Sequence, residues 1–475
     1  MNTTIYAITD SHQESRNLSR LLSGIYNMEK DNSKPCIILD AGDLFKGIYD
    51  KDMSVNAYLK IKELLPNSEI ILTIGNNDFG FIKKDFEYLK NTVEKFHQAG
   101  IHVVCANLTD SRTNLPLENI EKYKILDING EKILITGFCL DNSCAKKFKC
   151  ELAPPEQCFI DMINSVTEQF DKIVVLNHHW YTYSKSLLDV AKSKGVKIDL
   201  IIGGHEHSPI PPDYENNIFY PLSFARTMYK ISNTIEQIPL EKCGFIPQLE
   251  LPIIEYERQT RLKAPLAKRV LNLTKCYSDA CPLGTFISDE MKRLGNTDIA
   301  FHSTGFTMYP LKLEDSEYIT RYDLERVMCN TDATIETIVI TVEQLKKVFE
   351  NATKFRMLKD RGNSKFLQCS QNISITGKGN PDEENYRIFQ ISINGENLLD
   401  EIHNPIDPKR KFTCTIDPFI GSGEQGFEVL KNIPKTKILK NGKEIKINEM
   451  FYNAVINAEN AYTNSNYPSF KFTDL

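Results

Sequence analysis

Five short motifs in the first half of the chain bring together carboxylate, imidazole and amide side chains, and each motif follows a run of apolar residues. Aspartate oxygen and neutral imidazole nitrogen suit divalent Mn, Zn, Fe or similar ions, whereas the lack of thiolates argues against copper(I) or an iron–sulfur cluster. The motifs therefore predict a metal site. Its seven candidate ligands are Asp10, His12, Asp43, Asn76, His178, His205 and His207.

One carboxylate of this set is expected to serve two ions. The two oxygens of a carboxylate can bridge cations that lie about 3.5 to 4 Å apart. Asp43 is the expected bridge, because the preceding Gly42 lets the backbone turn sharply where a strand ends. Seven ligands also exceed what a single ion needs. We therefore expect two divalent metal ions (Mn, Zn, Fe or similar) as cofactors.

Each motif taken alone has a simpler explanation. Asp10 could cap a helix that begins near Glu14, and Asn76 could close a turn. His205 and His207 could be exposed loop residues. Five motifs in this order, which together hold five of the nine histidines, make chance agreement the weaker interpretation.

The elements that must position these side chains alternate between strands and helices. From residue 4 to about 207, short β-branched runs alternate with segments whose apolar residues recur every three or four positions, which is typical of βαβ units in an α/β fold. Ligands gather beyond the carboxyl ends of strands in open α/β sheets, and the motifs stand there. The expected strands are 5–9, 36–39, 69–73, 101–105, 173–176 and 200–202. The expected helices are 17–28, 53–65, 84–99 and 158–171.

The chain is expected to form two domains, since 475 residues exceed what one hydrophobic core usually supports. Prolines and mixed charge between about 225 and 265 predict the connection. We expect a metal-binding domain over 1–235, a linker over 236–264 and a mixed α+β domain over 265–475. Hairpin turns are predicted at Asn129-Gly130, Asn394-Gly395 and Asn441-Gly442.

Composition argues against several classes of protein. The net charge is −6, without a basic stripe, so neither a nucleic-acid partner nor a membrane surface is expected. The segment 1–8 lacks the features of a signal peptide, which predicts a cytoplasmic location. The twelve cysteines show no CxxC spacing and are expected to be reduced and mostly buried. The sequence leaves the oligomeric state open.

The order D-x-H, G-D, G-N, H and G-H-x-H resembles the calcineurin-like metallophosphoesterases, and within them the chain is most similar to the 5′-nucleotidase family. The second half carries similar landmarks in the family's order: Cys281-Pro282-Leu283-Gly284, 319–327, 341–352, Phe366-Leu367-Gln368 and 419–427. The resemblance implies a four-layer α/β/β/α sandwich, followed by a 5′-nucleotidase-like substrate domain of mixed α+β structure.

The resemblance also implies how the candidate ligands divide between two ions, with Asp43 as the bridge. The sets that would each hold one ion are Asp10, His12 and His207, and Asn76, His178 and His205. It implies that a hydroxide between the metals attacks phosphorus in line, while the metals act as Lewis acids.

Two positions beside the second ligand set depart from the family's pattern. In the family the asparagine ligand is followed by a histidine, which an aspartate three positions later orients toward the phosphate. This chain has Asn77 and Gly80 there. Asn77 can donate a hydrogen bond to a phosphoryl oxygen but cannot deliver a proton. The candidates for catalytic contact are therefore Asn77 and, from another strand end, His179.

The second half departs at the positions that bind substrate. The family's asparagine-triglycine-arginine loop looks like 301–307 here and has no arginine, and a stacking aromatic is replaced near Asn330. Gln425 stands in place of the aspartate that binds ribose. The residues expected to contact the substrate are His302, Thr307, Phe419, Gln425 and Phe427.

These observations predict a metal-dependent phosphoesterase that hydrolyses a nucleotide or another small phosphorylated compound. The alternative is a catalytically weakened, metal-binding member that serves as a binding or regulatory protein, which would explain the absent histidine and arginine. A third interpretation retains catalysis but restricts it to diphosphate or aryl leaving groups, because these depart without a proton.

Overall fold

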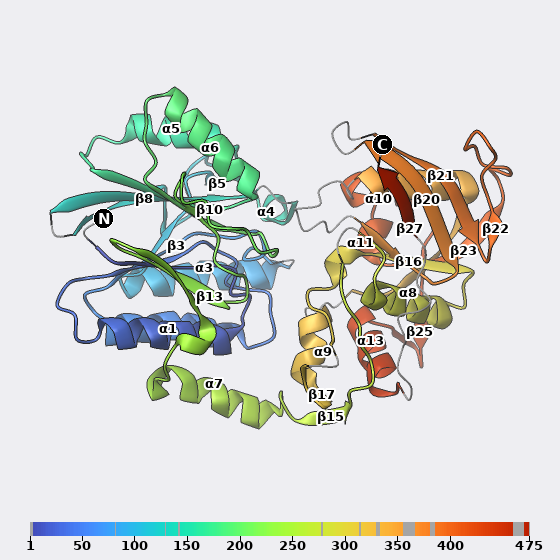
Figure 1. Ribbon diagram of the computed structural model, residues 1–475, viewed down its shortest axis with the longest axis horizontal. Coiled ribbons are helices and arrows are strands. Elements are labelled where there is room, and N and C mark those ends of the chain that lie inside the picture. Colours follow the sequence, from blue (N-terminus) through green and yellow to red (C-terminus); the bar gives the residue numbers. More distant parts are fainter. Residues whose placement is uncertain are drawn as a thin grey trace. The chain divides into compact units, whose positions relative to one another are not determined.

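The structure, a computed structural model, describes residues 3–80, 82–128, 130–140, 143–276, 279–312, 315–328, 333–354, 366–380, 385–458 and 470–474. The chain divides into two compact units, Met1–Thr260 and Arg261–Leu475. Figure 1 shows their strands and helices along the chain, and each unit is described by itself.

Two sheets form the centre of the first unit. The larger sheet has the strand order β14-β13-β1-β2-β3-β4-β6, and the smaller has the order β12-β11-β10-β8-β7. Strands of the larger sheet are β14 (Ile235–Pro239), β13 (Thr227–Ile231), β1 (Ile5–Ile8), β2 (Ile37–Asp40), β3 (Glu69–Leu72), β4 (His102–Val104) and β6 (Ile120–Glu121). Strands of the smaller sheet are β12 (Ile218–Phe219), β11 (Leu200–Gly204), β10 (Lys172–His178), β8 (Glu131–Cys139) and β7 (Tyr123–Ile128).

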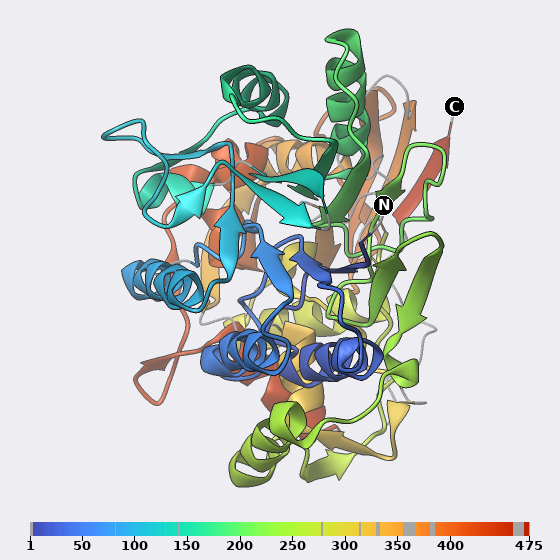
Figure 2. The same cartoon turned by 90° about the vertical axis from the view of Figure 1, so that its left-hand side faces the viewer.

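Alternating side chains give both sheets two buried faces and create four layers. In β1, Ile5 shares a core cluster with Val174 of β10, so the inner faces of the two sheets pack against each other. The neighbouring Tyr6 faces the other way, into a cluster with Leu18 of α1. Helices α5 and α6 cover the outer face of the smaller sheet. Figure 2 shows both sheets between these helix layers, which confirms the α/β/β/α sandwich.

Seven helices of the first unit lie in the described ranges. They are α1 (Ser15–Glu29), α2 (Lys51–Leu64), α3 (Lys83–Gln98), α4 (Ser143–Lys147), α5 (Pro155–Ser165), α6 (Tyr181–Ser193) and α7 (Pro247–Thr260). A short antiparallel pair, β5 (Leu108–Asp110) and β9 (Cys150–Leu152), completes the unit. Helix α6 was not expected, because its polar first turn hides the apolar spacing that begins at Leu187.

The expected linker over 236–264 differs from this division, because α7 fills much of it. Leu249 lies in the core cluster beneath the larger sheet. Glu250 is fully buried and accepts a hydrogen bond from Arg20 Nε at 2.8 Å. The helix begins on Pro247, at a position where a helix tolerates proline, and it also contains Pro252 in its interior. The prolines of this segment therefore did not indicate a linker.

The second unit contains a five-stranded and a four-stranded sheet and has the expected mixed α+β composition. Phe301 of β16, Ile391 of β21 and Phe349 of α10 share one core cluster, and α8, α9 and α13 share another. The strands are β16 (Ile299–Ser303), β18 (Glu336–Thr341), β19 (Leu367–Cys369), β23 (Lys411–Ile416) and β24 (Thr436–Lys437), then β20 (Ile373–Asn380), β21 (Asn385–Ile393), β22 (Glu396–Asn397) and β27 (Phe470–Asp474). The helices are α8 (Pro282–Gly295), α9 (Arg321–Met328), α10 (Val342–Lys354), α11 (Pro418–Gly421), α12 (Glu428–Lys431) and α13 (Ile447–Ile456).

The hairpin predictions can be compared with the paired strands. Asn394-Gly395 and Asn441-Gly442 have positive φ angles at both residues, as a type I′ turn requires, and join β21 to β22 and β25 (Leu439–Lys440) to β26 (Lys443–Glu444). Strands β7 and β8 also pair as a hairpin around Gly130, whereas Asn129 lies outside the described residues. The asparagine–glycine signal was therefore informative in both units.

Two expectations from composition can be checked on the described residues. The cysteines with described side chains are free thiols, and most of them are buried. Within the described ranges, no helix combines the length and the apolar character that crossing a bilayer requires.

Candidate metal centre

Strand exits position the candidate ligands. Asp10, Asp43 and Asn76 follow β1, β2 and β3, which are parallel neighbours in the larger sheet. His178 ends β10 and His205 follows β11, which are parallel neighbours in the smaller sheet. Parallel neighbours end at the same edge of a sheet, and the two sheets pack face to face. The fold therefore brings polar residues from distant segments to one place.

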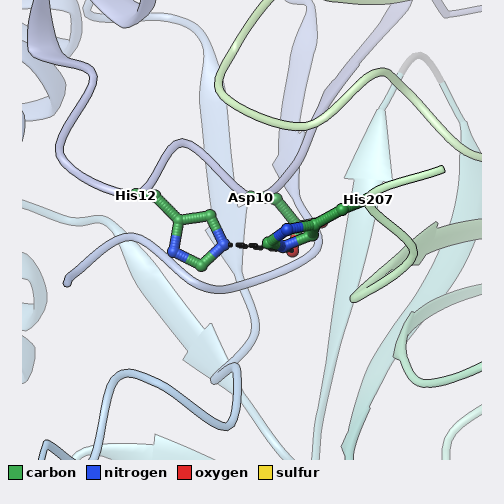
Figure 3. Close-up of side chains that lie close together, drawn as sticks. All are labelled: Asp10, His12 and His207. Atoms are coloured by element: carbon green, nitrogen blue, oxygen red, sulfur yellow. Dashed lines mark hydrogen bonds and ion pairs between the residues drawn. The ribbon is translucent and has the colours of Figure 1, made fainter. Parts of the chain in front are cut away.

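The first ligand cluster consists of Asp10, His12 and His207, whose potential ligand atoms all lie within 4.8 Å of one another. Figure 3 shows the two rings meeting beside the carboxylate. The Nε2 atoms of His12 and His207 are 3.0 Å apart, and each lies 3.6 Å from Asp10 Oδ1. These are the three residues that were expected to hold one ion.

The second ligand cluster consists of Asp43, His178 and His205, again with ligand atoms within 4.8 Å. Asn76 joins it, because its Oδ1 lies 2.8 Å from His205 Nδ1 and 3.2 Å from His178 Nε2. Asp43 Oδ2 is 3.2 Å from His178 Nε2 and 3.6 Å from His12 Nε2. Asp43 thus contacts both clusters, as a bridging carboxylate must.

The hydrogen bonds of His178 show that a cation fits this cluster. Its Nδ1 lies 2.7 Å from the carbonyl oxygen of Ala41, which can only accept, so Nδ1 carries the proton. In the neutral ring, the Nε2 lone pair then faces the oxygens of Asp43 and Asn76, at 3.2 Å each. Three acceptor atoms then converge, an arrangement that a positive ion satisfies.

His205 provides a second test of the fit. Its Nε2 is buried and has no hydrogen-bond partner in the described part of the chain. A buried nitrogen without a partner costs free energy unless a ligand occupies it. The second cluster therefore has the donor atoms, burial and unmet bonding capacity of a metal site, and the first has the same kinds of donor atoms and similar burial.

The pKa shifts of the imidazoles follow from burial and from the two carboxylates. Burial, aided by the charge of His178, lowers the pKa of His205 to about 3, and burial also lowers that of His207. Burial acts in the same direction on His178, but the charge and hydrogen bond of Asp43 outweigh it and raise the pKa to about 10. A proton on His178 would supply the positive charge that the oxygens require, and a metal ion would replace it.

Four of the seven candidate ligands lie on a left-handed backbone. The φ angles are 46° at Asp10, 45° at His12, 58° at Asp43 and 74° at His205. Side chains other than glycine rarely adopt this region, and such strain accumulates at functional sites. Gly42, at 95°, makes the expected sharp turn after β2.

Asp78 fixes the two loops that carry Asp43 and Asn76. Its Oδ2 accepts hydrogen bonds from the backbone N–H groups of Asp43 (3.1 Å) and Gly75 (2.8 Å), and its Oδ1 accepts one from Phe45 (2.9 Å). The side chain is almost completely buried. Sequence analysis missed this role, although an acidic residue two positions after a candidate ligand was a visible signal.

Asn77 supports Asp43. Its backbone N–H donates to Asp43 Oδ1 at 2.7 Å, and its side-chain Nδ2 donates to Asp43 Oδ2 at 2.6 Å. Its Oδ1 accepts a hydrogen bond from Lys46 Nζ at 3.0 Å. Asn77 thus orients the bridging carboxylate, and one of its two amide hydrogens is already used there.

The structure places His179 against α6. Its ring packs on Tyr183 with a centroid distance of 3.7 Å, and its Nδ1 accepts the backbone N–H of Trp180 at 2.9 Å. The ring is nearly buried. These contacts favour packing over the catalytic contact proposed from the sequence.

Three of the expected substrate residues in the second unit are buried within it. Both ring nitrogens of His302 face backbone carbonyl oxygens, at 2.9 and 3.2 Å, and the side chain is inaccessible. Phe427 belongs to the core cluster of both sheets. Thr307 is buried and donates to the carbonyl of Thr304 at 3.1 Å. The structure thus gives these three side chains contacts in the interior of the unit, and their expected contact with substrate stays a prediction.

Phe419 differs from this group. It is only partly buried, packed at the margin of the same core cluster, and is the candidate that keeps an exposed surface. The Gln425 side chain and Asn330 lie outside the described residues.

Sequence models of two protein families match successive parts of the chain. The model described as calcineurin-like phosphoesterase matches residues 3–209, and that described as 5′-nucleotidase, C-terminal domain, matches residues 259–432. The first match contains all seven candidate ligands. Fold and site therefore define a phosphoester hydrolase of the calcineurin-like class, a class that uses divalent metals. Within it, the chain belongs to the two-domain 5′-nucleotidase family.

Individual relatives agree with this assignment. Apyrase from Tabanus yao is 22% identical over 92% of this chain and 84% of its own length. A 5′-nucleotidase precursor from Thermus thermophilus superimposes with a TM-score of 0.76 at 16% identity, over 99% of both chains. A sulfate thiohydrolase from the same organism gives 0.68 at 15% identity, over 96% of this chain and 82% of its own. These two solved structures show the fold, and a nucleotidase and a sulfate thiohydrolase that share it show that the fold alone does not determine the substrate.

Proposed function

We propose that this chain is a metal-dependent phosphoesterase that hydrolyses nucleoside phosphates. The observation that carries the proposal is the position of Asp43, which contacts ligand residues of both clusters through one carboxylate oxygen. Nucleotides are supported as substrates by the apyrase and 5′-nucleotidase relatives. This choice of substrate rests on those relatives rather than on a contact within this chain.

The residues of the chain would hold two divalent ions in the sets described above. When bound, the ions would supply Lewis acidity toward the phosphoryl oxygens and lower the pKa of a water molecule. His205 and His207 are available as neutral ligands at neutral pH, because burial lowers their pKa values. Asn77 would keep the carboxylate of Asp43 oriented between the two sets.

The absence of a proton donor at Asn77 bears on which phosphates react well. An alkoxide that leaves from a ribose carbon has a high pKa and needs a proton, whereas a phosphate or an aryl oxide leaves readily without one. We therefore infer that nucleoside diphosphates or triphosphates, cleaved at a phosphoanhydride bond, are better substrates than nucleoside monophosphates.

Phosphate release tests both parts of this proposal. Protein stripped with EDTA and reloaded with Mn²⁺ or Zn²⁺ would be offered AMP, ADP, ATP and p-nitrophenyl phosphate. We expect release that depends on the metal and is faster from ADP, ATP and the aryl ester than from AMP. Release from none of these compounds by metal-loaded protein would contradict the proposed function.

The alternative of a catalytically weakened, metal-binding member that serves as a binding or regulatory protein has no support from the matching families, which are described as calcineurin-like phosphoesterase and 5′-nucleotidase. A cytoplasmic location stays a prediction from the sequence.

A further inference from the structure

Lys46 stands at the entrance to the candidate metal centre. It follows the bridging residue Asp43 by three positions, and its side chain is only partly buried, like those of Asn76 and Asn77. Its Nζ donates a hydrogen bond to Asn77 Oδ1 at 3.0 Å. Asn77 in turn donates two hydrogen bonds to Asp43. Asn77 therefore connects the charge of Lys46 to the expected bridging ligand, Asp43, through hydrogen bonds.

The loop that carries Lys46 is fixed on both sides of it. The backbone N–H of Phe45 donates to the buried Asp78, at 2.9 Å, and that of Gly47 donates to the buried Gln13 Oε1, at 2.7 Å. Lys46 itself has a φ angle of 71°, which orients the chain away from a regular helix or strand. Hydrogen bonds to buried side chains therefore hold the backbone of Lys46 in place, although its side chain is partly exposed.

Gly47 allows this loop to lie directly against the first ligand cluster. A Cβ atom at this position would meet the carbonyl oxygen of His12 at 1.6 Å, so only glycine fits. The segment that carries Lys46 therefore packs against the first ligand cluster.

From this geometry we propose that Lys46 binds the phosphate of the substrate as a fixed positive charge. It would do so beside Asn77, which stands where related enzymes have a histidine. The proposal rests on the proposed function, because it names a contact in the same site. It assigns Lys46 no proton transfer. The charge would stabilise negative oxygen atoms of the phosphoryl and leaving groups as they develop in the transition state.

A fixed charge and a proton donor differ in their effects on leaving groups. A positive charge lowers the barrier for any leaving oxygen that becomes negative, but it cannot convert an alkoxide into an alcohol. Lys46 would therefore serve phosphoanhydrides and aryl esters. Without the charge of Lys46, the rate of hydrolysis should depend more steeply on the pKa of the leaving group.

Binding of inorganic phosphate tests the contact without any turnover. Isothermal titration calorimetry on Mn²⁺-loaded protein would compare the parent with Lys46→Met, which keeps the chain length but removes the charge, and with Lys46→Arg, which keeps the charge. Lys51→Met is the matched control, since Lys51 pairs with Asp85 at 2.6 Å outside the clusters. Metal content and melting temperature would be measured for every variant.

We expect Lys46→Met to weaken phosphate binding about tenfold or more, the usual effect of losing one charge-assisted hydrogen bond. Lys46→Arg should retain most of the affinity, and Lys51→Met should match the parent. Equal phosphate affinity in Lys46→Met and Lys51→Met, with normal metal content, would overturn the proposal. So would a metal-loaded parent that binds no phosphate, because Lys46 would then have no anion to contact.

Kinetics with substituted phenyl phosphates separates this proposal from the proposed function. We expect Lys46→Met to lower kcat/KM most for the poorest leaving groups in the series. If phosphate binding depends on Lys46 but neither nucleotides nor aryl esters are cleaved, the function is wrong and the anion contact stands. If the parent cleaves them and Lys46→Met cleaves them equally well across the series, the function stands and the role of Lys46 is wrong.

Discussion

The ligand clusters of the first unit and the surroundings of Asp417 in the second unit bury polar side chains in opposite ways. In the first unit, Asp43 and His178 face each other at the strand exits, where acceptor atoms converge and a buried imidazole nitrogen of His205 has no partner in the described chain. In the second unit, the buried carboxylate of Asp417 accepts backbone N–H groups from Ser303, Phe419 and Ile420. The unpartnered nitrogen of His205 is therefore available to a ligand, while the three hydrogen bonds of Asp417 support the backbone.

This difference predicts a separation between activity and stability. Side chains of the ligand clusters should matter for catalysis more than for folding, since their converging acceptor atoms are suited to hold a cation and lie outside the hydrophobic core clusters. Buried side chains of the second unit should matter for folding more than for catalysis. Each of the following experiments tests one side of that separation.

The largest effect is expected from Asp43→Asn. Removing the charge that both clusters share should lower kcat by about a thousandfold and reduce the bound metal. Without metal, the variant should unfold at a lower temperature than the parent, because it loses the contact between the charge of Asp43 and the buried His178. Asp189→Asn, on the exposed surface of α6, is the control. Phosphate release, elemental analysis and thermal unfolding give the three measurements, and unchanged metal content would contradict the bridging assignment.

The second effect falls on stability. Phe427→Ala should cost about 3 to 5 kcal/mol, because the ring is completely buried in the core cluster of both sheets. The matched variant Phe419→Ala should cost less, because that ring is only partly buried. Urea denaturation measures both costs. Of the two, only Phe419→Ala is expected to change KM for a nucleotide, and a changed KM in folded Phe427→Ala would restore Phe427 as a substrate residue.

The contrast between these residues also explains what the sequence could predict. Ligand side chains such as Asp10 and His178 were recognisable because their chemistry is rare after apolar strands, so several of them together carry information. Phe427 was not distinguishable from a binding residue, since aromatic side chains are common both in cores and in binding sites. The metal ligands were predicted from the chemistry of their side chains, whereas the substrate residues were predicted only from the resemblance to a family.

Other features could not be predicted because they depend on tertiary contacts. The role of Asp78 requires three backbone N–H groups from two loops to meet, which no local pattern reveals. Lys46 looks like any solvated surface lysine until the loop is seen to pass over His12. Helix α7 was missed because proline was interpreted as a linker signal. The six strands expected between residues 5 and 202 and the hairpin turns needed only local signals, whereas β13 and β14 were not predicted.

A third prediction concerns pH and the second unit. Burial raises the pKa of Asp417 to about 6 from 3.8, with the charge of Glu336 acting in the same direction and the N–H donors against it. Because the folded form binds this proton more tightly than the unfolded form, the stability contributed by protonation is lost as pH rises from about 4 to about 6. The loss is up to about 3 kcal/mol and should be complete above that window.

Asp417→Asn separates this group from the other carboxylates that titrate in the same range. The amide cannot ionise, so the difference in unfolding free energy between parent and variant should change between pH 4 and pH 6 and be constant outside it. Phosphoesterase activity per folded molecule should not follow that change. Parallel pH profiles for parent and variant would show that Asp417 does not titrate in this window.

The smallest effect is expected from Asn77→His, which restores the imidazole of related enzymes. The gain should be about tenfold and confined to poor leaving groups such as AMP, well below the usual contribution of a positioned acid. One reason is that the variant loses the hydrogen bond from Asn77 Nδ2 to Asp43. Another is that no orienting aspartate can be added at Gly80, where φ is 66° and a Cβ would meet the Cβ of Asp85 at 2.1 Å.

The pH dependence of that gain would tell whether the new imidazole acts as an acid. The charge of Lys46 lies beside position 77 and disfavours a second positive charge, so it should lower the pKa of the introduced histidine. Only the protonated ring can deliver a proton to an alkoxide. The gain in kcat for AMP should therefore increase as pH falls, and the combined variant Asn77→His with Lys46→Met should shift that increase to higher pH. A gain that is independent of pH, or equal for AMP and p-nitrophenyl phosphate, would mean that the histidine acts only by repositioning Asp43.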